Sequence, residues 1–195
     1  MIVLMAGLPG TGKTTLAREL ALRISGRVLS KDQMRHALFA PEEIEYSTRQ
    51  DDFCLQVMLE TAAYLLHQDR SRILFLDGRP FSRRYQIENV VNAAMDLHQS
   101  WRIIECVCAE EIAKARLDDQ AAAGSHAAAN RNYELYLEVK SRFEFDTCAW
   151  MIFHHVLQGQ VPIESLQMVG QAVVGAAKIV TLVFDAGAKI PFPSD

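Results

Sequence analysis

Short runs of apolar residues alternate along this chain with longer stretches in which apolar residues recur three and four positions apart. Runs that are apolar throughout are typical of strands covered on both faces in a parallel sheet. The strands predicted on this basis are residues 2–6, 27–30, 73–77, 103–108 and, less regularly, 150–153. We expect the first of them to be the central strand.

The stretches between these runs show the spacing of helices with one apolar face. The predicted helices are residues 13–24, 33–39, 48–69, 85–97, 111–120 and 133–143. Strands that alternate with helices predict an α/β fold with a doubly wound, mostly parallel sheet. The chain has 195 residues, half of them hydrophobic, and contains no Pro/Ser-rich linker, so residues 1–195 are predicted to form a single domain.

The apolar segment from Met168 to Phe184 raises the question of a membrane span. It contains Gln171 and Lys178 and is marginal in length for a span. We therefore expect a buried helix near the C-terminus and no membrane partner.

The overall charge limits the ligands that the chain can bind. A net charge of −4 and a pI near 5.9 argue against extended nucleic-acid binding, which needs a clustered basic face. The cysteines and histidines lack metal-ligand spacing, and Cys106 and Cys108 fit one face of a buried strand. The chain reaches a glycine-rich loop at once, leaving no room for a cleavable signal, so we expect a cytoplasmic protein.

Residues 7–14 read Gly-Leu-Pro-Gly-Thr-Gly-Lys-Thr, which satisfies the G-x-x-x-x-G-K-[ST] pattern of a phosphate-binding loop, or P-loop. Its glycines let backbone N–H groups approach phosphate oxygens, and the following helix points its positive end at them. Lys13 is expected to reach the β- and γ-phosphates of ATP, and Thr14 to offer its hydroxyl to Mg²⁺. The residues predicted to bind the nucleotide are Gly7, Pro9, Gly10, Thr11, Gly12, Lys13, Thr14 and Thr15.

Two carboxylates are expected near this loop, because the carboxyl ends of parallel strands meet at one edge of the sheet. Asp77 ends the third predicted strand, where a P-loop protein places a Mg²⁺ ligand, although it could simply cap a turn with Gly78. Asp32 follows the second strand and could accept the proton of an attacking hydroxyl, or could cap a helix starting at Gln33. Arg35, one helical turn on, could hold an acceptor phosphate or the carboxylate of Asp32.

The loop, Asp32-x-x-Arg35, Asp77-Gly78 and Arg116-Leu117 together resemble the small P-loop kinases related to polynucleotide kinase, zeta toxins and chloramphenicol phosphotransferase, from Met1 to about Phe145. The resemblance implies a three-layer α/β/α P-loop NTPase fold with a five-stranded sheet and a short helical lid at about residues 109–132. It also implies that Asp32 is the catalytic base. Arg116 and Arg131 match the lid arginines that close over the phosphates.

Two departures from the relatives bear on the acceptor. This chain has Gly78-Arg79-Pro80 after the third-strand Asp, where relatives frequently carry a small residue, Thr and Asn, and it has Gln120 in place of a second lid arginine. Arg79, with Arg83 and Arg84, could bind an anionic acceptor. A solvated basic turn is the simpler interpretation.

The sequence thus predicts a kinase that moves the γ-phosphoryl group of Mg-ATP to a hydroxyl of a small molecule or a nucleic-acid end. Lys13, Asp32 and Arg116 would be its catalytic residues, Arg35 and Arg79 would bind the acceptor, and no oligomeric state is specified. An ATPase or nucleotide switch acting on a protein partner is the alternative, and a non-catalytic binding module is the third hypothesis. The guanine-reading N-K-x-D element of GTPases is absent from the sequence.

Overall fold

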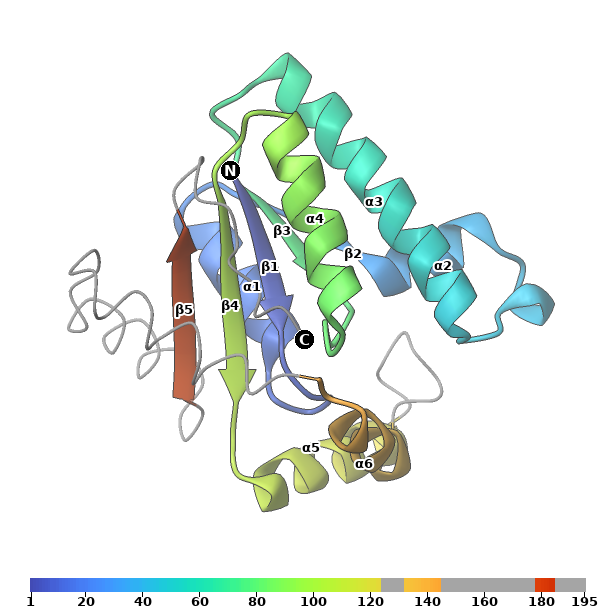
Figure 1. The fold of residues 1–195 in the computed structure, drawn as a ribbon. Coiled ribbons are helices and arrows are strands. Elements are labelled where there is room, and N and C mark those ends of the chain that lie inside the picture. Colours follow the sequence, from blue (N-terminus) through green and yellow to red (C-terminus); the bar gives the residue numbers. More distant parts are fainter. Residues whose placement is uncertain (124–131, 145–177, 185–195) are drawn as a thin grey trace.

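The computed structural model describes residues 1–123, 132–144 and 178–184. Within these residues a central sheet lies between helices, and two further helices cross below the carboxyl ends of its parallel strands (Figure 1). In chain order the elements are β1 (Ile2–Ala6), α1 (Lys13–Arg23), β2 (Arg27–Ser30), α2 (Lys31–Leu38), a 3₁₀ turn (Pro41–Glu43), α3 (Thr48–Gln68), β3 (Leu74–Asp77), α4 (Arg84–Asp96), β4 (Trp101–Val107), α5 (Glu110–Ala123), α6 (Tyr133–Ser141) and β5 (Lys178–Phe184).

The strands lie in the order β2-β3-β1-β4-β5. The first four in this order are parallel, and β5 pairs with β4 in the antiparallel direction. β1 is central and fully buried, as its apolar sequence predicts. The register sets Ser30, the last residue of β2, beside Asp77, the last residue of β3. The segments that follow β2 and β3 therefore leave the sheet together.

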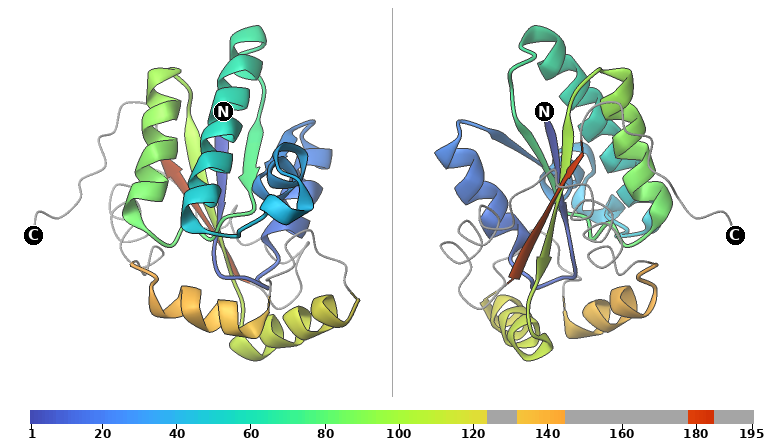
Figure 2. Two further views of the ribbon diagram at one scale, coloured as in Figure 1. Left: turned by 90° about the vertical axis from the view of Figure 1, so that its right-hand side faces the viewer. Right: turned by 60° about the vertical axis from the view of Figure 1, so that its left-hand side comes forward.

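Apolar side chains fill a core on each face of the sheet. On one face, α3 and α4 pack against alternate residues of the strands, among them Leu4, Leu76 and Trp101. On the other face, α1 packs Leu16 and Ala17 against residues that include Met5 and Phe75. Figure 2 shows the sheet nearly edge-on between these two layers. The predicted three-layer α/β/α fold is confirmed, since helices pack against both faces of the sheet.

The prediction of a helix over residues 168–184 is wrong for its last part. Residues 178–184 form β5, which adds a strand beside β4. The segment is rich in β-branched residues, including Ile179, Val180 and Val183, which favour a strand. A long apolar run does not by itself distinguish a buried helix from a strand. The predicted strand at 150–153 and residues 168–177 lie outside the described residues.

Helices α5 and α6 pack against one another below the carboxyl end of β1 (Figure 1). Leu117 and Ala113 of α5 contact Tyr136 of α6 in a small apolar cluster. An ion pair between Glu110 and Lys140 joins the same two helices. Helix α5 lies within the predicted lid region of about 109–132, whose residues 124–131 are outside the description. None of the described helices is long and apolar enough to cross a bilayer.

The burial of a side chain predicts how much its replacement by alanine destabilises the fold. Leu76 of β3 is fully buried, so Leu76→Ala should lower the free energy of unfolding by about 2–5 kcal/mol, through lost burial and a residual cavity. Leu22→Ala is the matched control, because Leu22 of α1 is 78% exposed and should change the value by no more than about 0.5 kcal/mol. Urea denaturation of the two variants measures the difference. Equal losses would contradict this core assignment.

Candidate active site

The P-loop takes a conformation that glycine makes accessible at three positions. Gly7, Gly10 and Gly12 have φ of +122°, +79° and +96°, in the region that other residues rarely adopt. A Cβ on Gly7 would lie 2.3 Å from the carbonyl oxygen of Cys106 in β4. The N–H of Gly7 donates to the carbonyl of Pro80 at 3.0 Å. The start of the loop is therefore pressed between β4 and the segment after β3.

Within the loop, polar side chains donate to backbone carbonyls. The Lys13 ammonium donates to the carbonyls of Gly7 and Leu8, each at 2.7 Å. The Thr11 hydroxyl donates to Leu8 at 2.8 Å. Lys13 is 6% exposed, so its charge lies within the curve of the loop, where a phosphate would meet it.

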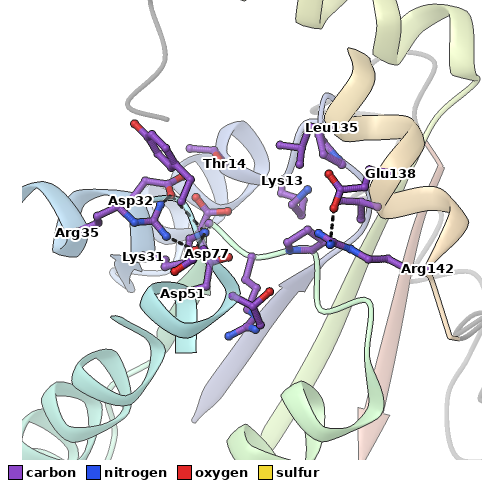
Figure 3. Close-up of a pocket in the computed structure, with 18 residues that line it drawn as sticks. Lys13, Thr14, Lys31, Asp32, Arg35, Asp51, Asp77, Leu135, Glu138 and Arg142 are labelled. Atoms are coloured by element: carbon purple, nitrogen blue, oxygen red, sulfur yellow. Dashed lines mark hydrogen bonds and ion pairs between the residues drawn. The ribbon is translucent and has the colours of Figure 1, made fainter. Parts of the chain in front are cut away.

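A cavity of about 340 Å³ opens beside the loop. Figure 3 shows Lys13 between a group of charged side chains from β3, α2 and α3 and a second group from α6. Pro9, Lys13 and Thr14 line the cavity, whereas Thr15 is exposed and is not among the lining residues. The remaining lining residues are Lys31, Asp32, Arg35, Tyr46, Ser47, Thr48, Asp51, Asp77, Gly78, Arg79, Pro80, Leu135, Glu138, Val139 and Arg142.

Asp77 is placed as a Mg²⁺ ligand would be. It ends β3, lines the same cavity as Thr14 and is 2% exposed. Its Oδ1 atom is buried and makes no hydrogen bond within the described structure. An unpaired buried carboxylate oxygen is costly unless a ligand satisfies it. The donor set of one carboxylate and one hydroxyl fits Mg²⁺, which takes few protein ligands and completes its shell with phosphates and water.

Asp32 belongs to a compact ion-pair network. Arg35 donates to Asp32 at 3.2 Å and also pairs with Asp51 of α3. Lys31 lies 2.7 Å from Asp51 and 3.5 Å from Asp32. The guanidinium of Arg35 is 1% exposed and lies over the ring of Tyr46. Of the two predicted roles of Arg35, the structure therefore shows the one in which it holds the carboxylate.

The interpretation of Asp32 as a helix cap is wrong. Helix α2 begins at Lys31, and its N-cap is Ser30, whose hydroxyl accepts the N–H of Gln33. Asp32 lies in the first turn, where a carboxylate complements the positive end of the helix. Asp51 occupies the corresponding first turn of α3. Both carboxylates thus point from helix starts into one cavity.

Arg79 is also placed differently from the simpler prediction. It is 3% exposed, pairs with Asp52 of α3 at 2.6 Å and lies near the hydroxyl of Tyr85 at 3.3 Å. A solvated basic turn is therefore wrong for Arg79, while Arg83 and Arg84 are half-buried. Arg79 lines the cavity, and its contact with an acceptor stays a prediction.

Two arginines approach the cleft from the helices below it. Arg116 of α5 donates to the carbonyl of Gly10 at 3.4 Å but is not among the residues that line the cavity, so its predicted contact with the phosphates stays a prediction. Arg142, which follows α6, lines the cavity and pairs with Glu138 at 2.6 Å. The predicted lid arginine Arg131 lies outside the described residues.

Four charged residues of the cavity were not predicted from the sequence: Lys31, Asp51, Glu138 and Arg142. Asp51 carries one local signal, an acidic residue in the first turn of a predicted helix, but such residues are common at helix starts. Glu138 and Arg142 resemble any exposed i,i+4 pair. Only the packing of α3 and α6 around the cleft distinguishes them.

Two thiols lie beside the P-loop. Burial raises the pKa of Cys106 from its ordinary 9.0 to about 11, partly opposed by the positive charge of Lys13. Burial also raises the pKa of Cys108, against the nearby charges of Arg116 and Lys13. Cys54, Cys106 and Cys108 are free thiols, and no metal-binding cluster of His, Cys, Asp and Glu occurs among the described residues. The prediction of buried cysteines is confirmed for Cys54 and Cys106, Cys108 is half-buried, and Cys148 lies outside the described residues.

The parallel sheet, the P-loop at the end of β1 and the carboxylates at the ends of β2 and β3 define a P-loop nucleotide-binding domain. The AAA domain family AAA_33 matches residues 2–145, and the chain therefore belongs to that family. This match and the shared fold confirm the resemblance to small P-loop kinases that the motifs indicated. No curated protein matches the chain by sequence.

Solved structures share the fold over most of the chain. A putative kinase from Chloroflexus aurantiacus J-10-fl is 21% identical, with 73% of this chain and 77% of that chain covered and a TM-score of 0.58. A gluconokinase from Sinorhizobium meliloti 1021 is 14% identical, with coverage of 73% and 74% and a TM-score of 0.52. Kti12 from Chaetomium thermophilum, in complex with ADP-AlF3, is 16% identical, with coverage of 74% and 81% and a TM-score of 0.52. Such identities show the fold alone.

Asp77→Asn tests the metal site. The amide keeps the shape but loses the charge, so the affinity for ATP in the presence of Mg²⁺ should fall about 10- to 100-fold. The affinity for ATP in EDTA should stay within about twofold of the parent's, because no cation is then held. Calorimetry measures both, with Asp96→Asn at the exposed end of α4 as the control. Equal losses with and without Mg²⁺ would indicate a structural role instead.

The raised pKa of Cys106 predicts a pH dependence of stability. The folded thiol holds its proton up to about pH 11, while the unfolded thiol loses it near 9.0. The contribution is therefore fully present below pH 9 and is lost as the pH rises toward 11, to a total of about 3 kcal/mol. Urea denaturation should show that Cys106→Ala loses less stability than the parent between these values. Parallel profiles for the two proteins would refute the burial argument.

Proposed function

We propose that this protein is an ATP-dependent phosphotransferase that moves the γ-phosphoryl group of Mg-ATP to a hydroxyl of an acceptor bound in the cavity. The observation that carries the proposal is that one cavity is lined by Lys13 and Thr14 of the P-loop, by Asp77 and by Asp32. A protein that only hydrolyses or senses ATP needs the first three groups. The same cavity extends from the P-loop to charged residues of α2, α3 and α6, which supports the proposal that a second substrate binds there.

In the proposed reaction the acceptor oxygen bonds to the γ-phosphorus while the bond to the β–γ bridging oxygen breaks. The bond electrons leave with ADP, and the hydroxyl proton passes to the carboxylate of Asp32. Arg35 holds that carboxylate in place through its contact of 3.2 Å, which limits the orientations that Asp32 can take. Lys13 supplies positive charge at the β- and γ-phosphates, and Arg116 adds charge from α5.

Thr14 and Asp77 would hold Mg²⁺, which neutralises phosphate charge and orients the transferred group when bound. The helix α1 begins at Lys13 and directs its positive end toward the same phosphates. Lys13 exchanges its bonds to the Gly7 and Leu8 carbonyls for phosphate oxygens when the nucleotide binds. Helices α5 and α6 would close the cleft below and exclude water from the transfer.

The test is a screen with labelled ATP across sugars, nucleosides, nucleic-acid ends and antibiotics. Lys13→Ala should abolish labelling of the acceptor, and Asp32→Asn should lower kcat by about 10²- to 10⁴-fold, the usual contribution of a general base, while Mg-ATP still binds. Glu60→Gln, on the exposed side of α3, is the control and should match the parent.

Two results would contradict the proposal. One is the absence of any labelled acceptor together with an Asp32→Asn variant that behaves like the parent. The other is robust ATP hydrolysis without an acceptor that a protein partner stimulates, which would favour a nucleotide switch.

A further inference from the structure

The cavity has two halves with different charge. The nucleotide half comprises Lys13, Thr14 and Asp77 with the start of α1. The acceptor half comprises the side chains from α2, α3, the segment after β3 and the region of α6. Figure 3 shows two walls of the acceptor half on either side of Lys13, with Asp32, Arg35 and Asp51 on one wall and Glu138 and Arg142 on the other.

Every basic side chain that the acceptor half contributes is paired with a carboxylate of the chain itself. Arg35 pairs with Asp32 and Asp51, and Lys31 pairs with Asp51. On the remaining walls the pairs are Arg79 with Asp52, and Arg142 with Glu138. Four cations thus face four carboxylates, and this half of the cavity is close to neutral.

Three of the four cations are buried, which makes their pairs costly to open, whereas the pair of Arg142 with Glu138 is partly exposed. Arg35 and Arg79 are 1% and 3% exposed, and Lys31 is 7% exposed. An anionic acceptor that captured Arg35 would leave Lys31 as the only other cation paired with Asp32 and Asp51 among the described residues, so two carboxylates would share one positive charge in a largely buried site, which is unfavourable. It would also remove the group that orients Asp32. An anion therefore competes with the network that the proposed chemistry needs.

Hydroxyl groups meet the same network without breaking it. A hydroxyl donates to a carboxylate that is already paired and accepts from an N–H of a paired guanidinium, since both groups have several bonding positions. The half-buried ring of Tyr46 lines the cavity beside these groups and offers an apolar surface to ring carbons. The volume of about 340 Å³ includes the nucleotide half and already lies at the small end of ligand pockets, so the acceptor half has room only for a small molecule.

We propose that the acceptor is an uncharged polyhydroxy compound, of the size of a sugar, a polyol or a nucleoside, and that Arg35 and Arg79 with their carboxylate partners select against anionic acceptors. This inference rests on the proposed phosphotransfer and narrows it. Arg35 and Arg79 were both predicted to bind an anionic acceptor. In this proposal they act as hydrogen-bond donors, because carboxylates of the chain neutralise their charge.

Matched acceptors that differ only in charge test this selectivity. The probes are D-glucitol against D-gluconate, and adenosine against adenosine 3′-monophosphate, with a 5′-hydroxyl oligonucleotide as a polyanion. The uncharged member of the productive pair should have a kcat/KM higher by about tenfold or more, since the anion meets no unpaired cation. Higher kcat/KM for the anionic member, or labelling of the oligonucleotide alone, overturns the inference but leaves the phosphotransfer standing. Absence of Lys13-dependent transfer to every probe overturns the proposed function itself.

A charge-releasing variant provides a second readout. Asp52→Asn removes the partner of Arg79, so the ratio of kcat/KM for the anionic over the uncharged acceptor should rise about tenfold. Asp118→Asn removes an exposed ion pair with Lys114 on α5 and should leave the ratio unchanged. Thermal melting of both variants verifies that they are folded. A ratio that does not move in folded Asp52→Asn overturns the role assigned to the neutralised arginine.

Discussion

The close contact of the P-loop with two neighbouring strands is the constraint on which the site depends. Gly7 lies so near the backbone of Cys106 that no side chain fits, and its N–H is held by Pro80. This contact fixes where the chain turns out of β1 and therefore where α1 starts. The position of Lys13 and Thr14, and the direction of the helix dipole, follow from the same turn. The hydrogen bond from Gly7 to Pro80 also holds the segment after β3 that carries Arg79.

The second organising feature is the distribution of charge around the cleft. Near the P-loop, Lys13 and Arg116 contact backbone carbonyls, which a phosphate can replace. Farther away, the cations contact carboxylates that α2, α3 and α6 contribute. The first helical turns of α2 and α3 supply Asp32 and Asp51, which complement the positive helix ends and hold Arg35. The cations near the P-loop therefore have contacts that an anion can replace, whereas the charges of the cations farther away are neutralised by carboxylates.

The elements and the motif residues could be predicted because they have local causes. The spacing of apolar residues predicted the four parallel strands and the helices around them to within a few residues. The glycine-rich pattern predicted the P-loop, and the ends of apolar runs predicted that Asp32 and Asp77 lie together. The prediction of a helix at residues 178–184 was wrong because an apolar run fits either element. Partners in another part of the chain, here β4, decide between them.

The fold class, the nucleotide-binding loop and the pair of strand-end carboxylates follow from local patterns, since hydrophobic period and glycine requirements act over a few residues. The contacts of each charged side chain depend instead on how distant segments pack. The local sequence around Arg79 is that of a solvated turn, yet its partner is Asp52 of α3. Glu138 and Arg142 form an ordinary i,i+4 pair in the sequence, and only the position of α6 beside the cavity brings them to the site. Ion pairs between distant segments depend on how helices pack around the sheet, and no local spacing encodes that packing.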